Sequence, residues 1–272
     1  MLGIGISTPG LIDTTSGIVR RAVNFGWQDL LLRNIVQSHF NLPIYVANDS
    51  HMVALAEYMF GQPQNSANLV VIKVGQGIGA GIVLNGQLFL GDDYGAGEIG
   101  HVVVVEDGSL CKCGNHGCLE AVASIAWIVR RAQEIAEVVT TSPLSQFAAE
   151  GRTIDLEAVI QAVGAGDPAA RRLIEEVGRY LGAAVANLVG VLNVRRVVIT
   201  GRVAPFGSTL NESIRHELRR RVLPALAEAT EVEVLAQGPD AVLLGTSALL
   251  LTNELGLTRL VRRDARTEEI AA

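Results

Sequence analysis

The sequence predicts an α/β fold from three observations. Hydrophobic residues make up 49% of the 272 positions, aromatic residues 4% and charged residues 18%, which is typical of globular α/β proteins. Short runs of β-branched residues ending in turns alternate with longer segments whose apolar residues recur every three or four positions. The length is sufficient for one large hydrophobic core or two smaller ones.

The first part of the chain is expected to contain two strands, each followed by a turn or a helix. A strand over residues 3–7 leads into the turn Thr8-Pro9-Gly10. Leu30, Ile35 and Phe40 recur at helical intervals and predict a helix over 29–40. A short strand is expected over 44–47 and a helix over 50–60.

Asn48 and Asp49 therefore lie at a strand-to-helix junction, which is a common functional position in open α/β sheets. Asp49 has two alternative roles. Its carboxylate caps the following helix, or it is a general base that removes a hydroxyl proton from a bound polyol that Asn48 orients.

A glycine-rich turn is predicted between two strands after a change of composition near Gln62. The segment LVVIKVGQGIGAGIVLNGQLFLG is expected to form a strand, this turn, a second strand and a hairpin at Asn85-Gly86. The turn lacks the lysine and hydroxyl of a phosphate-binding P-loop. Glycines at such a turn either let backbone N–H groups approach a phosphate or allow two strands to cross closely; they are Gly75, Gly77 and Gly79.

The remainder of the chain is mainly helical. Apolar residues at intervals of three and four predict helices over 119–136, 156–165 and 168–192, the last rich in alanine and glycine and suited to close packing. Strands are expected over 196–201 and 232–234, with helices over 210–223 and 244–253.

All three cysteines fall within eight residues and predict a metal site. Cys111, Cys113 and Cys118 have the spacing C-x-C-x4-C, and with one histidine they form a tetrahedral zinc set. His101 is preferred as the fourth ligand over His116, whose closeness to Cys118 would strain the ring closure. Four protein ligands leave no position for an activated water, so the metal would be structural. The alternatives are three unpaired thiols, or one disulfide with an odd thiol.

The charge and hydropathy of the chain exclude several classes of protein. A net charge of −6 and a pI near 5.4 argue against a broad nucleic-acid surface, so any DNA contact would come from another segment. No apolar run reaches the roughly 18–20 residues that span a bilayer, and the N-terminus lacks a basic region before its first apolar residues. The expected location is cytoplasmic, where clustered cysteines bind metal more often than they pair.

The motifs STPGLID, ANDS, GQGIGAGIV, GEIGH and CKCGNHGCLE together resemble the ROK family of sugar kinases, sugar-responsive repressors and related open reading frames. The resemblance covers nearly the whole chain. It implies an actin-like ATPase fold (ribonuclease H-like, hexokinase-related) with two domains, the N-terminal one incomplete, and a sugar in the cleft between them. The expected smaller domain comprises 1–62 with 248–272, and the larger one, carrying zinc, comprises 63–247. The resemblance also implies a homo-dimer or tetramer.

The same resemblance assigns roles to individual residues. Asp49 matches the base of the family's kinases, and the residues that would hydrogen-bond sugar hydroxyls are Asn48, Asp49, Glu98, His101 and Glu120. The zinc ligands would be His101, Cys111, Cys113 and Cys118. On the nucleotide side the matching glycines are Gly75, Gly77, Gly79 and Gly201.

Departures from the family pattern concern the nucleotide side. Family kinases carry an N-terminal D-x-G-x-T strand and turn for ATP phosphates and magnesium, and this chain begins after that point. Gln76 replaces a common threonine, and in TGRVAPFG the side chains of Arg202 and Val203 would crowd a nucleotide. The favoured interpretation is therefore the effector-binding part of a carbohydrate-responsive transcriptional regulator without its winged-helix DNA-binding segment.

Two other interpretations stay open. One is an ATP-dependent kinase that phosphorylates the C6 hydroxyl of a hexose or N-acetylhexosamine, with Asp49 as general base and magnesium-ATP as donor. The other is a catalytically silent, zinc-stabilised assembly module. The sequence does not identify the sugar.

Overall fold

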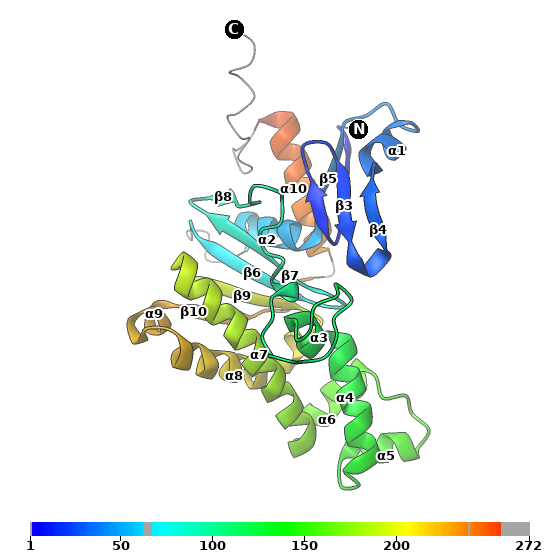
Figure 1. Ribbon diagram of the computed structural model, residues 1–272, viewed down its shortest axis with the longest axis vertical. Coiled ribbons are helices and arrows are strands. Elements are labelled where there is room, and N and C mark those ends of the chain that lie inside the picture. The colour runs from blue at the N-terminus through cyan, green and yellow to red at the C-terminus, as the bar shows by residue number, and fades with distance from the viewer. Residues whose placement is uncertain (1, 62–66, 239, 257–272) are drawn as a thin grey trace. The chain divides into compact units, whose positions relative to one another are not determined.

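The computed structural model describes residues 2–61, 67–238 and 240–256 (Figure 1). The described residues form two compact units. Unit 1 contains the described residues of Met1–Leu69, Gly81–Gly97 and Pro239–Ala272, and unit 2 contains Val70–Ala80 and Glu98–Gly238. The sequence expectation assigned 81–97 to the larger domain, whereas the structure groups this segment with unit 1. The charged tail after Gly256 lies outside the described residues.

Unit 1 contains a parallel strand pair and a small antiparallel sheet. Strand β1 (Ile4–Thr8) pairs with β5 (Ile44–Asn48), with Thr8 opposite Asn48. The three-stranded sheet has the order β2 (Leu11–Asp13), β3 (Ile18–Ala22) and β4 (Trp27–Leu30). Apolar side chains of both sheets form one buried cluster: Ile12, Val19, Ala22, Ile44 and Val46.

The helix predicted over 29–40 is wrong in its first part. The chain continues in β4 to Leu30, with a short 3-10 helix η1 (Val23–Phe25) before it, and α1 spans Leu32–Gln37. Leu30 pairs with Val19 of β3 and packs against the buried cluster. The pairing of this segment with a neighbouring strand thus outweighs the helical spacing of its apolar residues.

The helices of unit 1 are α2 (Asp49–Phe60) and α10 (Ala241–Leu255), which pack against each other. A Cβ at Gly245 of α10 would lie 1.8 Å from the carbonyl oxygen of Met52 in α2. Only a glycine permits this approach, so Gly245 brings the two helices into backbone contact.

Five strands form the largest sheet, in the order β10 (Glu231–Val234), β9 (Arg196–Gly201), β6 (Leu69–Val74), β7 (Ile78–Leu84) and β8 (Gln87–Leu88). Strand β9 is parallel to both β6 and β10, and β7 is antiparallel to β8. The division between the units falls within β6 and β7. The predicted hairpin is confirmed, because Asn85 and Gly86 both have positive φ, 51° and 75°.

The helices of unit 2 follow the sheet in chain order. The long helix α7 begins at the predicted residue, where Asp167 caps it and Pro168 occupies its first turn, and it ends before Asn193 in the left-handed conformation. Its Gly178 and Gly182 allow the close approach of α8 that Figure 1 shows. The helices are α3 (Leu119–Ala123), α4 (Ile125–Val138), α5 (Pro143–Ala149), α6 (Leu156–Gly164), α7 (Pro168–Leu192), α8 (Gly207–Arg221) and α9 (Pro224–Ala229), with the 3-10 helices η2 (Ile99–His101) and η3 (Ala204–Phe206).

The single helix predicted over 119–136 is in fact two. Ser124 has extended backbone angles, and its hydroxyl accepts a hydrogen bond from Trp127 N at 3.4 Å as the N-cap of α4. Apolar residues recur at helical intervals across this break, so the sequence pattern does not reveal where one helix ends and the next begins. None of the helices in the described residues is long and apolar enough to span a membrane.

Candidate functional site

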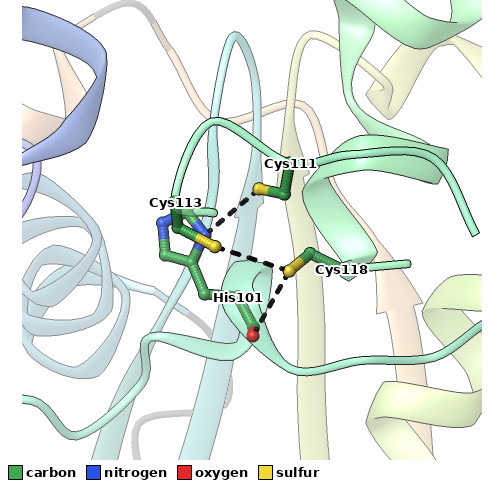
Figure 2. A group of neighbouring side chains, drawn as sticks. All are labelled: His101, Cys111, Cys113 and Cys118. Atoms are coloured by element: carbon green, nitrogen blue, oxygen red, sulfur yellow. Dashed lines mark hydrogen bonds between the residues drawn. The ribbon is translucent and has the colours of Figure 1, made fainter. Parts of the chain in front are cut away.

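The structure brings His101 and the three cysteines together in unit 2 (Figure 2). One potential ligand atom from each residue lies within 4.8 Å of all the others. His101 Nδ1 is 3.7 Å from Cys111 Sγ, and the sulfurs of Cys113 and Cys118 are 3.6 Å apart. Tetrahedral zinc with ordinary Zn–S and Zn–N bonds needs about 3.5–3.8 Å between ligand atoms. Two of the distances between ligand atoms match this range, and all four side chains are close enough to hold one metal ion.

The chain places His101, and not His116, among the cysteines. His116 is exposed, and its Nδ1 lies 3.2 Å from the carbonyl oxygen of Gly108. All three cysteines are free thiols. A disulfide would bring two sulfurs to about 2.05 Å, well below the 3.6 Å between Cys113 and Cys118.

Backbone hydrogen bonds shape the loop around these cysteines. Gly114 N donates to Cys111 O at 3.0 Å, and Leu119 N donates to Val102 O at 3.0 Å. Gly117 has φ +71°, and a Cβ there would lie 1.7 Å from Val105 O. The loop thus closes on itself through close backbone contacts that glycine allows.

Burial and hydrogen bonds among the three thiols shift their pKa values in different directions. Burial, with contributions from the neighbouring thiols, raises the pKa of Cys118 to about 12 and also raises the pKa of Cys111. For Cys113, burial acts upward, but hydrogen bonds from Asn115 N–H and the two neighbouring thiols leave its pKa lowered. Three adjacent thiolates repel one another, so only a cation at their centre would hold all three deprotonated.

Glu120 and the glycine-rich turn are joined directly. The carboxylate of Glu120, 8% exposed at the start of α3, accepts a hydrogen bond from Ile78 N at 3.0 Å. A Cβ at Gly100 would lie 2.1 Å from Ile78 O. Ile78 thus contacts Glu120 on one side and, on the other, the short helix that follows Glu98 and ends at His101. Within unit 2 the first residue of β7 therefore lies between Glu120 and the segment from Glu98 to His101.

Asn48, and not Asp49, caps helix α2. The side-chain oxygen of Asn48 accepts hydrogen bonds from Ser50 N at 2.8 Å and His51 N at 3.2 Å, and its Nδ2 donates to Gly10 O at 2.9 Å. Asn48 is 6% exposed and has a structural role within unit 1. The capping alternative for Asp49 is wrong, because the residue before it supplies the cap. Asp49 Oδ1 lies 3.4 Å from Ser50 Oγ.

His51 is a residue that the sequence did not single out. Its side chain is buried, and its Nε2 donates to the carbonyl oxygen of Ala96 at 2.8 Å. Burial lowers the pKa of His51, although the Ala96 hydrogen bond and the charge of Asp49 act in the opposite direction. The neutral imidazole thus ties α2 to the segment that precedes Glu98. No local sequence signal marks this contact, because 45 residues separate its partners.

The fold requires glycine at some positions of the predicted nucleotide side and not at others. At Gly201, φ is +97° and a Cβ would lie 2.3 Å from Val74 O, so packing within unit 2 requires glycine. At Gly75 the backbone has no positive φ, and a Cβ would meet nothing closer than Gly77 O at 3.8 Å. The space beside Gly75 is therefore open, and neither backbone conformation nor packing requires a glycine there. Gly77 and Gly79 lie in the same turn, whose Gly75 N donates to Gly77 O at 2.9 Å.

The architecture and these motifs define a protein of the actin-like ATPase class, related to hexokinases, and the predicted fold class is confirmed. The chain belongs to the ROK family, whose family model matches residues 1–253. The resemblance stated from the motifs is therefore confirmed as well.

Relatives of the chain include both enzymes and repressors. A glucokinase from Halalkalibacterium halodurans is 36% identical over 255 residues, which cover 93% of this chain and 77% of the glucokinase. A xylose repressor from Caldicellulosiruptor bescii is 36% identical over 263 residues, which cover 94% of this chain and 64% of the repressor.

Solved structures show the same two kinds of protein. A ROK family transcriptional regulator, a homolog of the Escherichia coli MLC protein, superimposes with a TM-score of 0.83 at 33% identity, covering 93% of this chain and 62% of the regulator. A ROK family glucokinase from Streptomyces griseus, in complex with glucose and AMPPNP, gives 0.80 at 30% identity, covering 91% and 80%. Similarity alone therefore does not separate a regulator from a kinase.

Proposed function

We propose that the chain binds a sugar, with Asn48, Asp49, Glu98, His101 and Glu120 as the hydrogen-bonding partners of its hydroxyls. The observation that supports this proposal is the arrangement around Ile78: its N–H donates to the carboxylate of Glu120, and its carbonyl oxygen lies against Gly100, within the segment from Glu98 to His101. Hydrogen bonds between carboxylates and hydroxyls are charge-assisted and directional, so they suit discrimination between sugar epimers.

The four-residue cluster of His101, Cys111, Cys113 and Cys118 is proposed to bind structural zinc. Soft thiolates with one imidazole favour zinc over magnesium or calcium, and the distances between ligand atoms suit tetrahedral coordination. His101 presents Nδ1 to the cluster, which leaves Nε2 for a sugar hydroxyl. Zinc would then stiffen the loop that carries part of the sugar site.

A carbohydrate-responsive transcriptional regulator is the favoured biological role, with this chain as its effector-binding part. Support comes from Gln76 and Arg202, whose side chains line the same cavity of unit 2 beside the glycine-rich turn. Val203 is fully buried, so Arg202 is the one residue of this pair positioned to obstruct a nucleotide. DNA contact is assigned to a segment outside this chain, and assembly to a homo-dimer or tetramer.

A sugar kinase is the second candidate, because Asn48, and not Asp49, caps helix α2. In that reaction Asp49 would accept the proton of the sugar C6 hydroxyl as its oxygen attacks the γ-phosphorus of ATP, and ADP would leave. Magnesium would neutralise charge on the phosphates. The glycines proposed to lie near the nucleotide are Gly75, Gly77, Gly79 and Gly201.

The test measures binding and turnover on the same preparations. Calorimetry with a panel of hexoses, pentoses and N-acetylhexosamines should show saturable binding of one sugar, unchanged by ATP. Glu120→Gln should weaken it about 10- to 100-fold, the range for a hydrogen bond to a charged group. Glu137→Gln, at an exposed position of α4, is the matched control and should bind as the wild type does.

Turnover decides between the two roles. A coupled assay should detect no sugar-dependent release of ADP if the chain is a sensor. Sugar-dependent ADP release that Asp49→Asn abolishes would establish the kinase instead. Absence of binding for every sugar in the panel, by protein that retains its melting temperature, would reject both. Light scattering of the same sample gives the oligomeric state.

A further inference from the structure

Two thiols of the Cys/His cluster, those of Cys113 and Cys118, point toward each other (Figure 2). Their sulfur atoms are 3.6 Å apart. A disulfide bond needs about 2.05 Å between the sulfurs, so a shift of about 1.5 Å would join them. Four residues separate these cysteines along the chain, whereas a bond between Cys111 and Cys113 would close a much smaller ring around one residue. Distance and spacing thus favour Cys113 with Cys118 as a disulfide pair.

The two thiols differ in their access to solvent. Cys118 is 0% exposed, and Cys111 is only 5% exposed. Cys113 is half-buried and lies in the turn between Leu110 and His116, which form an isolated antiparallel bridge. A small oxidant in water therefore reaches Cys113 first. An accessible cysteine beside a second cysteine that can resolve it is typical of redox-sensitive sites.

Backbone contacts hold Cys118 in place and leave space beside Cys113. Cys118 pairs with Val103 in an isolated antiparallel bridge, and its carbonyl oxygen accepts a hydrogen bond from Ala121 N at 2.9 Å at the start of α3. A Cβ at Gly114, the residue after Cys113, would meet nothing within 4 Å. The turn that carries Cys113 therefore has space to shift toward Cys118, which itself stays fixed.

We propose that Cys113 and Cys118 are an oxidative modification site, at which a peroxide forms a disulfide and the proposed zinc is lost. The inference rests on the proposed metal site, because metal-bound sulfurs are thiolates, the form that reacts. The Cys113 sulfur attacks a peroxide oxygen, the O–O bond breaks, and hydroxide leaves a sulfenic acid behind. The Cys118 sulfur then attacks the Cys113 sulfur, the S–S bond forms, the S–O bond breaks and a second hydroxide leaves. The two sulfurs lose two electrons, which the peroxide gains.

Oxidation at this pair removes two of the four residues of the cluster as ligands. A disulfide sulfur no longer carries the charge of a thiolate, so only His101 and Cys111 remain, whereas structural zinc sites have four protein ligands. The ion is therefore expected to leave. His101 is also a proposed sugar partner, so oxidation would release a side chain of that site from its metal anchor.

Treatment of the full chain with hydrogen peroxide tests the proposal. Free thiols, released zinc and protein mass are followed on the same samples. Free thiols should fall from three to one per chain, while about one zinc per chain is released. Mass spectrometry of proteolytic peptides should locate the new bond between Cys113 and Cys118. Dithiothreitol should then restore all three thiols.

Three variants sharpen this test. Cys111→Ser keeps the reacting pair and should form the same disulfide, with no free thiol left. Cys113→Ser removes the accessible thiol, and its two buried cysteines should stay reduced under the same treatment. His116→Ala is the matched control, because His116 lies outside the cluster, and it should react as the wild type does. Thermal melting before treatment checks that each variant is folded.

The outcomes separate this inference from the proposed metal site. Three thiols that persist in peroxide, or a disulfide that contains Cys111, would overturn the assignment of the pair. Zinc that stays bound after the disulfide has formed would overturn the coupling between oxidation and metal loss. Protein that carries no zinc as isolated, yet forms the bond between Cys113 and Cys118, would reject the proposed zinc site and support the disulfide site.

Discussion

Replacement of Cys113 by serine isolates the contribution of the proposed metal. Cys111 and Cys118 are buried, at 5% and 0% exposure, whereas Cys113 is only half-buried. Serine at 113 therefore removes a thiolate ligand without opening a cavity in the core. Surface changes of this kind usually alter stability by about 0.5 kcal/mol or less when no ligand is involved.

The expected loss of stability follows from binding linkage. A ligand present at about 1,000 times its dissociation constant stabilises the folded state by about 4 kcal/mol. For a domain of about 150–250 residues, each kcal/mol corresponds to about 2–4 °C in melting temperature. Loss of zinc through Cys113→Ser should therefore lower the melting temperature of unit 2 by about 8–16 °C.

The assay combines metal content with melting curves. Wild-type protein should carry about one zinc per chain, the number that a single four-ligand site takes, and Cys113→Ser should carry little. Treatment with EDTA should lower the melting temperature of the wild type to near that of the variant, and should leave the variant unchanged. His116→Ala is the control, because His116 lies outside the cluster. A Cys113→Ser protein that retains both its zinc and its melting temperature would refute the ligand assignment.

Two further predictions concern backbone geometry and pH. Gly117→Ala should lower the free energy of unfolding by about 2–4 kcal/mol or more, because its Cβ would lie 1.7 Å from Val105 O. Gly114→Ala, at φ +102° with open space around it, should cost only about 1–2 kcal/mol; similar losses in urea denaturation would contradict this explanation. The pKa of His51 is lower in the folded state than its unfolded value of 6.5. The neutral His51 side chain therefore contributes fully to stability above pH 6.5. This contribution is lost as the pH falls from 6.5 toward the folded pKa. His51→Gln should reduce the decline of unfolding free energy between pH 7.5 and 5.5 by up to about 1.4 kcal/mol per unit of pH, and an unchanged decline would exclude His51 as its source.

Several elements were predictable because local chemistry determines them. Asp167-Pro168 marks the start of α7, and Asn85-Gly86 the hairpin, since both depend on the backbone preferences of a few adjacent residues. Predictions were less accurate where neighbours distant in sequence decide the conformation. Leu30 follows helical periodicity but lies in a strand, because β3 pairs with it.

The candidate site divides in the same way. Spacing predicted that the three cysteines and His101 lie together, because ligand type and order along the chain carry that information. The sequence by itself therefore determined the family, the fold class and which four residues form the Cys/His cluster. Only the tertiary structure decided that Asn48 caps α2, that His51 bonds to Ala96, and that Glu120 holds the amide of Ile78. The Ala96 and Ile78 contacts join residues more than 40 positions apart, and the cap is one of two that adjacent side chains could supply, so packing and hydrogen-bond geometry make the choice.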